Sequence, residues 1–319
     1  MKNLYITRKL PEAAIEQLRP YYNVTQWESS TVEATKEDII AQAKDAHAIL
    51  SMISDKIDED IMNAVPQLEI VSNLAVGYNN VDTAYAKTKG IKVTNTPGVL
   101  NNATADLAFS ILMAVARRIP QNEQVIHRNE WGSWSLEFGI GQDIAEKTIG
   151  IIGMGKIGQT LAKRATGFDM NILYHNRSRN EEAEQKYGAK YADLHTLLKE
   201  SDYVVLFTPL TDETYNMITL EELKLMKRTA ILVNAARGGI VNEADLYTAL
   251  KENIIWGAGS DVFEKEPISA DHPLLSLDNF VASPHVGSAT VETRNAMLQC
   301  NIDALIAHAK GEEVPYEVK

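Results

Sequence analysis

Short apolar runs alternate with amphipathic segments along the first hundred residues. The apolar runs predict strands at residues 3–7, 48–52, 68–75 and 91–94. The amphipathic segments predict helices at residues 12–19, 36–46 and 58–65. Strands that alternate with helices form parallel sheets covered on both faces, so this part of the chain is expected to be an α/β layer structure.

A second alternating set follows a break at Pro97-Gly98 and a long apolar helix predicted over residues 102–118. Six further strands are predicted, separated by helices such as 156–165 and 243–250. These strands are 148–152, 171–174, 203–207, 230–234, 256–260 and 280–283. The last amphipathic helix, 291–310, has no sheet in its own stretch, so it is expected to cross back to the first sheet.

Length and charge narrow the class of protein. The 319 residues suggest two domains at about 150 residues each. The net charge of −12 argues against a nucleic-acid or anionic-membrane binder, which needs clustered cations. The N-terminal segment lacks the apolar core of a secretory signal, and the apolar stretch 107–116 is too short to span a bilayer. A single cysteine, Cys300, excludes an intrachain disulfide, and packing is favoured for it over reactivity. We expect a soluble cytoplasmic protein.

A glycine-rich turn joins the strand 148–152 to the next helix. Gly153, Gly155 and Gly158 form Gly-x-Gly-x-x-Gly, in which they allow a tight turn, close approach of a pyrophosphate and close helix–strand packing. The helix start then offers free N–H groups to the phosphates. A nucleotide triphosphatase loop is disfavoured because Ile157, not Ser or Thr, follows Lys156. The segment predicts a dinucleotide site, the alternative being a plain glycine-rich turn.

The end of the next strand bears on the choice of cofactor. An acidic residue there would bind a free ribose 2′-hydroxyl, but the chain reads His175-Asn176-Arg177-Ser178-Arg179. Charge-assisted hydrogen bonds contribute about 1.5–3 kcal/mol each, so one or two could favour a 2′-phosphate by roughly tenfold to several hundredfold. The segment predicts NADPH as the preferred cofactor, with NADH possible. The alternative is a solvated basic turn.

Three polar segments follow the last three predicted strands. They contain Arg237, Glu266 and His285. Open α/β sheets bind ligands at the carboxyl ends of their strands, where all three residues are expected. Singly, each has an ordinary alternative: a surface cation, a solvated turn residue and a loop histidine bonded to backbone.

The order of these motifs resembles the D-isomer-specific 2-hydroxyacid dehydrogenases over essentially the whole chain. The segments Asn234-Ala235-Ala236-Arg237-Gly238, Asp261-Val262-Phe263-Glu264-Lys265-Glu266-Pro267 and Pro284-His285-Val286-Gly287-Ser288 occur in family order. Within the family, the glyoxylate/hydroxypyruvate reductases are most similar, including those that reduce 2-ketogluconate. Their features are matched by residues 76–82, Trp131, Trp134 and residues 272–275. Asn79, where Asp is expected, and Asn102-Ala103 depart from the pattern.

The resemblance implies a role for each polar residue. Arg237 would hold the carboxylate of a 2-oxo acid and polarise its ketone. His285 would give a proton to the developing alkoxide, with Glu266 stabilising the imidazolium. Backbone N–H groups of Val76 and Gly77 would also bind the carboxylate. The cofactor would be contacted by Thr104, Gly153, Met154, Gly155, Lys156, Ile157, Gly158, His175, Asn176, Arg177, Ser178, Pro209, Ala235 and Asp261. No metal site is predicted.

The resemblance also implies the domain organisation. Residues 1–98 and 288–319 would form a flavodoxin-like substrate domain, and residues 99–287 a Rossmann doubly wound cofactor domain. The family dimerises through the cofactor domain, so interface burial is favoured over core packing for Trp131 and Trp134. The expected activity is NADPH-preferring reduction of glyoxylate, hydroxypyruvate or a related 2-oxo acid to the D-hydroxy acid. A phosphoglycerate-type dehydrogenase and a nucleotide-sensing corepressor on the same fold remain as alternatives.

Overall fold

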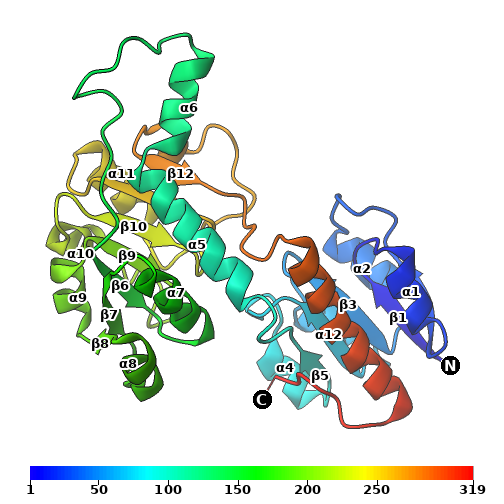
Figure 1. Ribbon diagram of the computed structural model, residues 1–319. Coiled ribbons are helices and arrows are strands. Elements are labelled where there is room, and N and C mark those ends of the chain that lie inside the picture. The colour runs from blue at the N-terminus through cyan, green and yellow to red at the C-terminus, as the bar shows by residue number, and fades with distance from the viewer. Residues whose placement is uncertain (319) are drawn as a thin grey trace. The chain divides into compact units, whose positions relative to one another are not determined.

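The computed structural model describes residues 1–318 and divides into two α/β units. Unit 1 comprises Met1–Leu100 and Ala289–Lys319, and unit 2 comprises Asn101–Ser288. Each unit is built on one parallel sheet (Figure 1). The predicted fold class, two domains each with a parallel α/β sheet, is confirmed.

Unit 1 contains a five-stranded sheet in the order β2-β1-β3-β4-β5. The strands are β1 (Lys2–Ile6), β2 (Tyr22–Gln26), β3 (Ala48–Met52), β4 (Ile70–Leu74) and β5 (Lys92–Thr94). The helices are α1 (Glu12–Leu18), α2 (Lys36–Ala43), α3 (Glu59–Ala64), α4 (Thr83–Thr88) and the terminal α12 (Val291–Lys310).

The strands of unit 1 bury both of their faces. Leu4 and Ile6 pack with α1 and α12, whereas Tyr5 between them packs with α2 and α3 on the opposite face. This alternation follows from the two-residue side-chain period of a strand. Because both faces are covered, these strands appear in the sequence as continuous apolar runs rather than as alternating ones.

Unit 2 contains a seven-stranded sheet in the order β12-β11-β10-β9-β6-β7-β8. The chain starts in the middle of the sheet, builds outward to one edge and then returns to build the other. The strands are β6 (Thr148–Ile152), β7 (Asn171–His175), β8 (Lys190–Tyr191), β9 (Tyr203–Leu206), β10 (Ile231–Asn234), β11 (Gly257–Ser260) and β12 (Phe280–Ala282). This order is that of the doubly wound dinucleotide-binding fold, whose ligands lie beyond the carboxyl ends of the strands.

The helices of unit 2 cover both faces of its sheet. The α-helices are α5 (Asn101–Ala116), α6 (Ile119–His127), α7 (Lys156–Thr166), α8 (Glu181–Tyr187), α9 (Leu194–Glu200), α10 (Leu220–Leu225) and α11 (Glu243–Lys251), and η1 (Pro273–Ser276) is a 3-10 helix. Helix α5 packs on α7, β10 and β11. Helix α6 and the chain after it extend away from this sheet (Figure 1).

One strand of unit 1 was not predicted from the sequence. Strand β2 lies at the edge of its sheet and pairs only with β1 among the described strands. Its residues alternate between buried or half-buried and exposed, because an edge strand is only partly covered. Such a short, half-polar run is hard to distinguish from a loop by its pattern alone.

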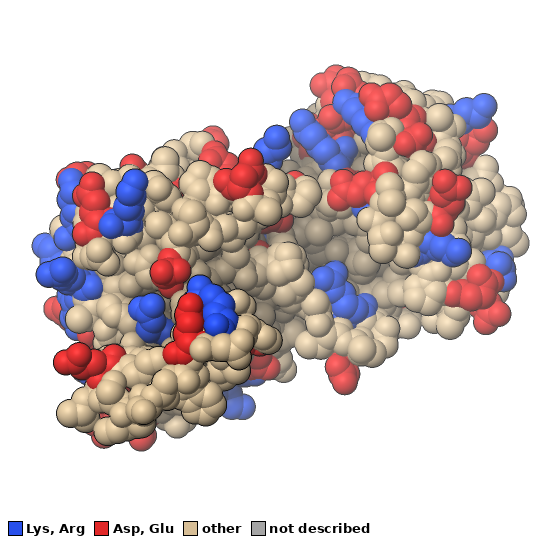
Figure 2. Space-filling view, turned by 90° about the horizontal axis from the view of Figure 1, so that it is seen from above, with Lys and Arg blue, Asp and Glu red and all other residues tan. Residues whose placement is uncertain are grey.

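Charge is mixed over the surface. On the face seen in Figure 2, acidic and basic side chains are interspersed and do not gather in one basic field. Within residues 1–318, no helix combines the length and the apolar character of a membrane-spanning segment.

Candidate active site

The glycine turn lies where the central strand β6 ends and α7 begins. Gly153 has φ +102°, a conformation that side chains other than glycine rarely adopt. A Cβ built on Gly158 would lie 2.2 Å from the carbonyl oxygen of Gly153, so the helix can approach the turn only with glycine there. Open space surrounds the equivalent position of Gly155. The turn therefore has both the tight geometry and the room that a pyrophosphate needs.

Two asparagine side chains between β7 and α8 form hydrogen bonds to the backbone of this turn. The Met154 N–H donates to Oδ1 of Asn176 at 2.8 Å, and Nδ2 of Asn180 donates to the Met154 carbonyl at 2.7 Å. The N–H groups of Lys156 and Ile157, at the first turn of α7, have no backbone acceptor among the described residues. They are available to the phosphates, so the chain's own groups fit a dinucleotide.

The basic segment after β7 contains one free and one paired arginine. Arg179 forms an ion pair with Glu184 at 2.6 Å, and its Nε also donates to that carboxylate. Arg177 is exposed and has no ion-pair partner in the part of the chain that the structure describes. Ser178 is exposed beside it, and His175 bonds through Nδ1 to the carbonyl of Ala192. Of the two arginines in this segment, Arg177 is therefore the one available to bind an added anion.

Arg237 follows β10 in a turn built by Asn234. The side chain of Asn234 donates to the Arg237 carbonyl at 2.9 Å and accepts from the Ala236 N–H at 3.1 Å. A Cβ on Gly238 would lie 1.9 Å from the Phe263 carbonyl oxygen, so this turn packs directly on the segment that follows β11. Burial lowers the pKa of Arg237, and the charge of Glu266 acts in the opposite direction.

Glu266 and His285 are in direct contact. Oε2 of Glu266 lies 2.6 Å from Nδ1 of His285, and Oε1 accepts from the Phe263 N–H at 2.8 Å. Partial burial raises the pKa of Glu266, but the hydrogen bonds from His285 and Phe263 and the charges of His285 and Arg237 outweigh burial, so the pKa lies below its ordinary value. Glu266 is therefore ionised at neutral pH. Since Nδ1 of His285 faces this carboxylate, Nε2 is the ring nitrogen available to a substrate.

Asp261 holds the loop that carries His285. Its two carboxylate oxygens accept the N–H groups of Val286 and Gly287, each at 2.9 Å, and its carbonyl accepts the His285 N–H at 2.8 Å. His285 has φ +53°, a left-handed conformation that costs roughly 1–3 kcal/mol and persists only where surrounding contacts, here those of Asp261, hold it. Asp261 was predicted only as a cofactor contact, and the sequence contains no signal for its role in holding this loop.

Thr104, predicted to contact the cofactor, is buried against the same loop. Its side-chain atoms lie 3.3–3.4 Å from where a Cβ of Gly287 would be. Pro209 and Ala235 lie just beyond β9 and β10, at the carboxyl edge of the sheet. The predicted cofactor residues thus gather along one edge of unit 2, and their contacts with a cofactor remain predictions.

Comparison with known proteins is consistent with this geometry. Residues 109–287 match the D-isomer specific 2-hydroxyacid dehydrogenase, NAD binding domain family. A glyoxylate reductase of Pyrococcus furiosus is 47% identical over 316 residues, covering 98% of this chain and 94% of the relative. A glyoxylate reductase of Korarchaeum cryptofilum is 45% identical, with the same coverage. The chain belongs to the D-isomer-specific 2-hydroxyacid dehydrogenase family.

Solved structures of the family superpose on the whole chain. A Thermus thermophilus protein has a TM-score of 0.93 at 37% identity, covering 99% of this chain and all of that chain. An NADPH-dependent glyoxylate/hydroxypyruvate reductase of Sinorhizobium meliloti, solved with NADP and malonate, has a TM-score of 0.86 at 33% identity and covers 99% of this chain and 96% of that chain. The predicted family is confirmed, and the protein is an NAD(P)-dependent oxidoreductase.

Of the four residues predicted to contact the substrate of this dehydrogenase, Arg237 and His285 lie in unit 2, and Val76 and Gly77 lie in unit 1. Val76 and Gly77 are half-buried in the loop that follows β4, at the carboxyl edge of the five-stranded sheet. Their N–H groups donate no hydrogen bond within the described residues. They are therefore free to bind an anion, as the prediction requires.

Proposed function

We propose that this dehydrogenase reduces glyoxylate, hydroxypyruvate or a related 2-oxo acid, such as 2-ketogluconate, to the D-2-hydroxy acid with NADPH. The observation that carries the proposal is the 2.6 Å contact between Oε2 of Glu266 and Nδ1 of His285. The charge of Arg237 helps to lower the pKa of the same carboxylate. All three residues follow neighbouring strands, β10, β11 and β12, of one sheet. The names of the relatives support this substrate class.

Arg237, Glu266 and His285 each have a separate role in the proposed reduction. When bound, the reduced nicotinamide supplies a hydride to the ketone carbon. Arg237 offers a planar fork that pairs with the substrate carboxylate and stabilises charge on the ketone oxygen. His285, protonated and held by Glu266 through Nδ1, transfers the proton on Nε2 to the alkoxide oxygen. After the transfer the imidazole is neutral, and a proton from solvent restores it.

Arg177 is the basis for a preference for NADPH. No carboxylate follows β7 to bind a ribose 2′-hydroxyl, and Arg179 is already paired with Glu184. Replacing Arg177 with serine is expected to raise the KM for NADPH by roughly 10- to 100-fold and to leave that for NADH unchanged, because only NADPH carries the 2′-phosphate. Steady-state kinetics with both cofactors measure this.

Arg179→Ser is the matched control, since Arg179 already has a carboxylate partner. It is expected to change the KM for NADPH much less than Arg177→Ser does. Equal effects of Arg177→Ser on the two cofactors would show that the segment does not recognise the 2′-phosphate.

A homodimer is proposed through the cofactor unit. The segment that follows α6 exposes large apolar side chains: Trp131 is 68% exposed, Trp134 81% and Leu136 82%. A contiguous set of exposed aromatic and aliphatic groups marks an association surface. A second copy of the chain is its proposed occupant, and a cytoplasmic location is proposed with it.

Trp134→Ala is expected to weaken the dimer roughly 30-fold or more, as truncation of a central aromatic anchor does. Sedimentation across a dilution series measures the dissociation constant. Val291→Ala, which shortens another strongly exposed apolar side chain, serves as the control and should leave it unchanged. A wild-type protein that sediments as a monomer would refute the dimer.

A panel of 2-oxo acids, assayed with NADPH and with NADH by the loss of absorbance of the reduced nicotinamide, tests the activity. Oxidation with glyoxylate or hydroxypyruvate supports the proposal. Cofactor binding without oxidation on any 2-oxo acid would indicate a nucleotide sensor instead.

A further inference from the structure

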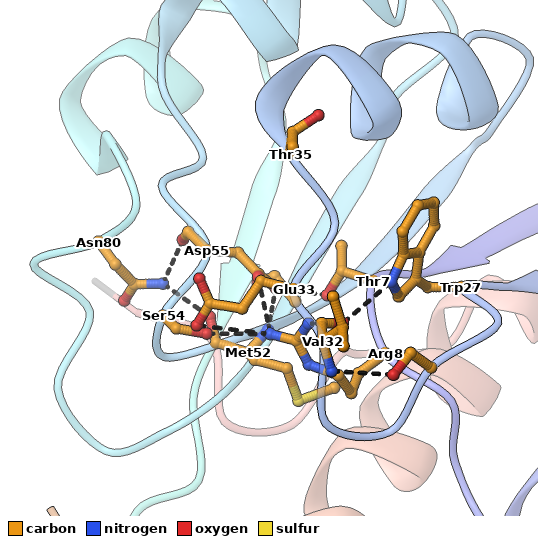
Figure 3. Close-up of polar contacts among 12 residues, drawn as sticks. Thr7, Arg8, Trp27, Val32, Glu33, Thr35, Met52, Ser54, Asp55 and Asn80 are labelled. Carbon is orange, nitrogen blue, oxygen red and sulfur yellow. Dashed lines mark hydrogen bonds and ion pairs between the residues drawn. The ribbon is translucent and has the colours of Figure 1, made fainter. Parts of the chain in front are cut away.

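A cluster of buried polar side chains lies at the carboxyl edge of the sheet in unit 1. Thr7 and Arg8 follow β1, Asp55 follows β3, and Asn80 follows β4 (Figure 3). These strands are neighbours in the sheet, so the residues after them meet at one edge. No step of the proposed reaction uses these groups, yet Asp55 is 4% exposed and Arg8 9%.

Asp55 fixes the loop that it belongs to. One of its carboxylate oxygens accepts from the Thr7 hydroxyl and from the Met52 N–H, the latter at 2.7 Å. Arg8 lies 3.5 Å from the other oxygen and also donates to the Ser54 hydroxyl at 3.1 Å and the Val32 carbonyl at 2.8 Å. The loop after β3 is thus held from both sides (Figure 3).

Asn80 joins this loop to the one that contains Val76 and Gly77. Its Nδ2 donates to the carbonyls of Met52 at 3.1 Å and Asp55 at 2.9 Å (Figure 3). Its side-chain amide also pairs reciprocally with that of Asn73, both contacts at 3.1 Å, and Asn73 donates to the Gly77 carbonyl at 3.2 Å. Asn80 therefore controls peptide groups in both loops.

A hydrogen bond that fixes the carbonyl of a peptide also fixes the direction of the N–H group in the same peptide. In a planar trans peptide the two groups point in opposite directions. The Met52 carbonyl is held by Asn80, the Val76 carbonyl by Asn95 at 2.7 Å and the Gly77 carbonyl through Asn73. The N–H groups of the following residues, Ile53, Gly77 and Tyr78, thus face away from these anchors, and none donates a hydrogen bond within the described residues.

We propose that Asn80 and Asp55 are positioning residues for the substrate carboxylate. They hold the loops after β3 and β4 so that the unpaired N–H groups of Ile53 and Gly77 form a preorganised anion cradle. This inference rests on the proposed function, because the anion concerned is the carboxylate of the 2-oxo acid. Without the hydrogen bonds of Asn80 and Asp55, the loops would sample other peptide orientations. The free energy needed to order them on binding would then lower the affinity for the carboxylate.

Asn80→Ala is expected to raise the KM for glyoxylate and the inhibition constant for oxalate by roughly 10- to 100-fold, the loss from a misaligned donor to a charged group. The dissociation constant for NADPH should remain within about twofold of wild type, because the cofactor residues lie in unit 2. Asp55→Asn should shift the same constants in the same direction, so the test stands if one variant does not fold. Amide hydrogen exchange over residues 51–57 and 74–80 should become faster in both variants.

Thr35→Ala is the control for simple destabilisation of unit 1. Thr35 caps α2 by accepting the Asp38 N–H, and its side chain has no hydrogen bond to either loop within the described residues, so its loss should lower the Tm without changing the KM. If Asn80→Ala and Asp55→Asn lower the Tm as Thr35→Ala does and leave the constants for glyoxylate and oxalate unchanged, the cluster is structural only and the inference is overturned. A wild-type protein with no turnover of any 2-oxo acid would instead overturn the proposed function, and this inference with it.

Discussion

Replacing His285 with alanine is expected to lower kcat for glyoxylate reduction about 10²- to 10⁴-fold, the range in which positioned general acids contribute. The reason is geometric: Glu266 binds Nδ1 of His285 at 2.6 Å and leaves Nε2 as the proton donor. Affinity for NADPH should change little, because β11, β10 and β9 separate β12, which precedes His285, from β6 and β7, which precede the glycine turn and the basic segment. Stopped-flow measurement of NADPH oxidation together with a fluorescence titration of cofactor binding separates the two quantities.

His195→Ala provides the matched control. His195 is exposed on α9 and should be replaceable without effect on turnover. His285→Ala with near-normal kcat would refute the proton-donor role. Glu266→Gln refines the result: it keeps the shape of the side chain but removes the charge that favours the imidazolium, so its loss of kcat should be smaller than that of His285→Ala.

Replacing Arg237 with alanine is expected to lower kcat/KM about 10- to 10⁴-fold, since one or two charge-assisted hydrogen bonds to the substrate are lost at about 1.5–3 kcal/mol each. Unlike His285→Ala, this change should both raise KM and lower kcat, because the guanidinium holds the carboxylate in the ground state and the ketone oxygen in the transition state. Full Michaelis curves with glyoxylate at saturating NADPH measure the two constants separately.

Two further variants sharpen the test of Arg237. Arg237→Lys keeps the charge but not the planar fork, so it should recover only part of the lost kcat/KM. Added guanidinium should partly restore the activity of Arg237→Ala, and not that of His285→Ala. Arg228→Ala, a change at an exposed arginine of the same unit, should behave as wild type. An Arg237→Ala variant that loses kcat alone would mean that the guanidinium does not hold the bound carboxylate.

Features that depend on residues close to one another in the sequence were predictable. The strand before Gly153 and the helix after Gly158 identify the dinucleotide turn without any tertiary information, because its chemistry depends on residues adjacent in the chain. The apolar runs likewise predicted most of the strands, since burial on both faces makes them continuous. The edge strand β2 was not predicted, because every second residue is exposed and the strand therefore lacks a continuous apolar run.

Contacts between segments distant in sequence were not predictable. The contact of Asp261 with the cofactor stays a prediction, and the hydrogen bonds of its carboxylate to the backbone of Val286 and Gly287, 25 and 26 residues later, were not foreseen. Arg177 and Arg179 look equivalent in the sequence, yet Glu184 on the next helix pairs with only Arg179. The anchoring roles of Asn80 and Asp55 had no signal in the sequence, because they depend on which backbone groups the two side chains reach in the fold.

The sequence by itself determined the family, most of the strands and helices in their order, the pyrophosphate turn and the residue types available for proton transfer and carboxylate binding. Only the tertiary structure decided which charges are free, which backbone groups remain unpaired and which nitrogen of His285 faces outward. The physical reason is that apolar periodicity and turn chemistry act between neighbours in the chain. Hydrogen bonds and ion pairs form wherever the parallel strands bring their carboxyl ends together, and that juxtaposition exists only in the folded protein.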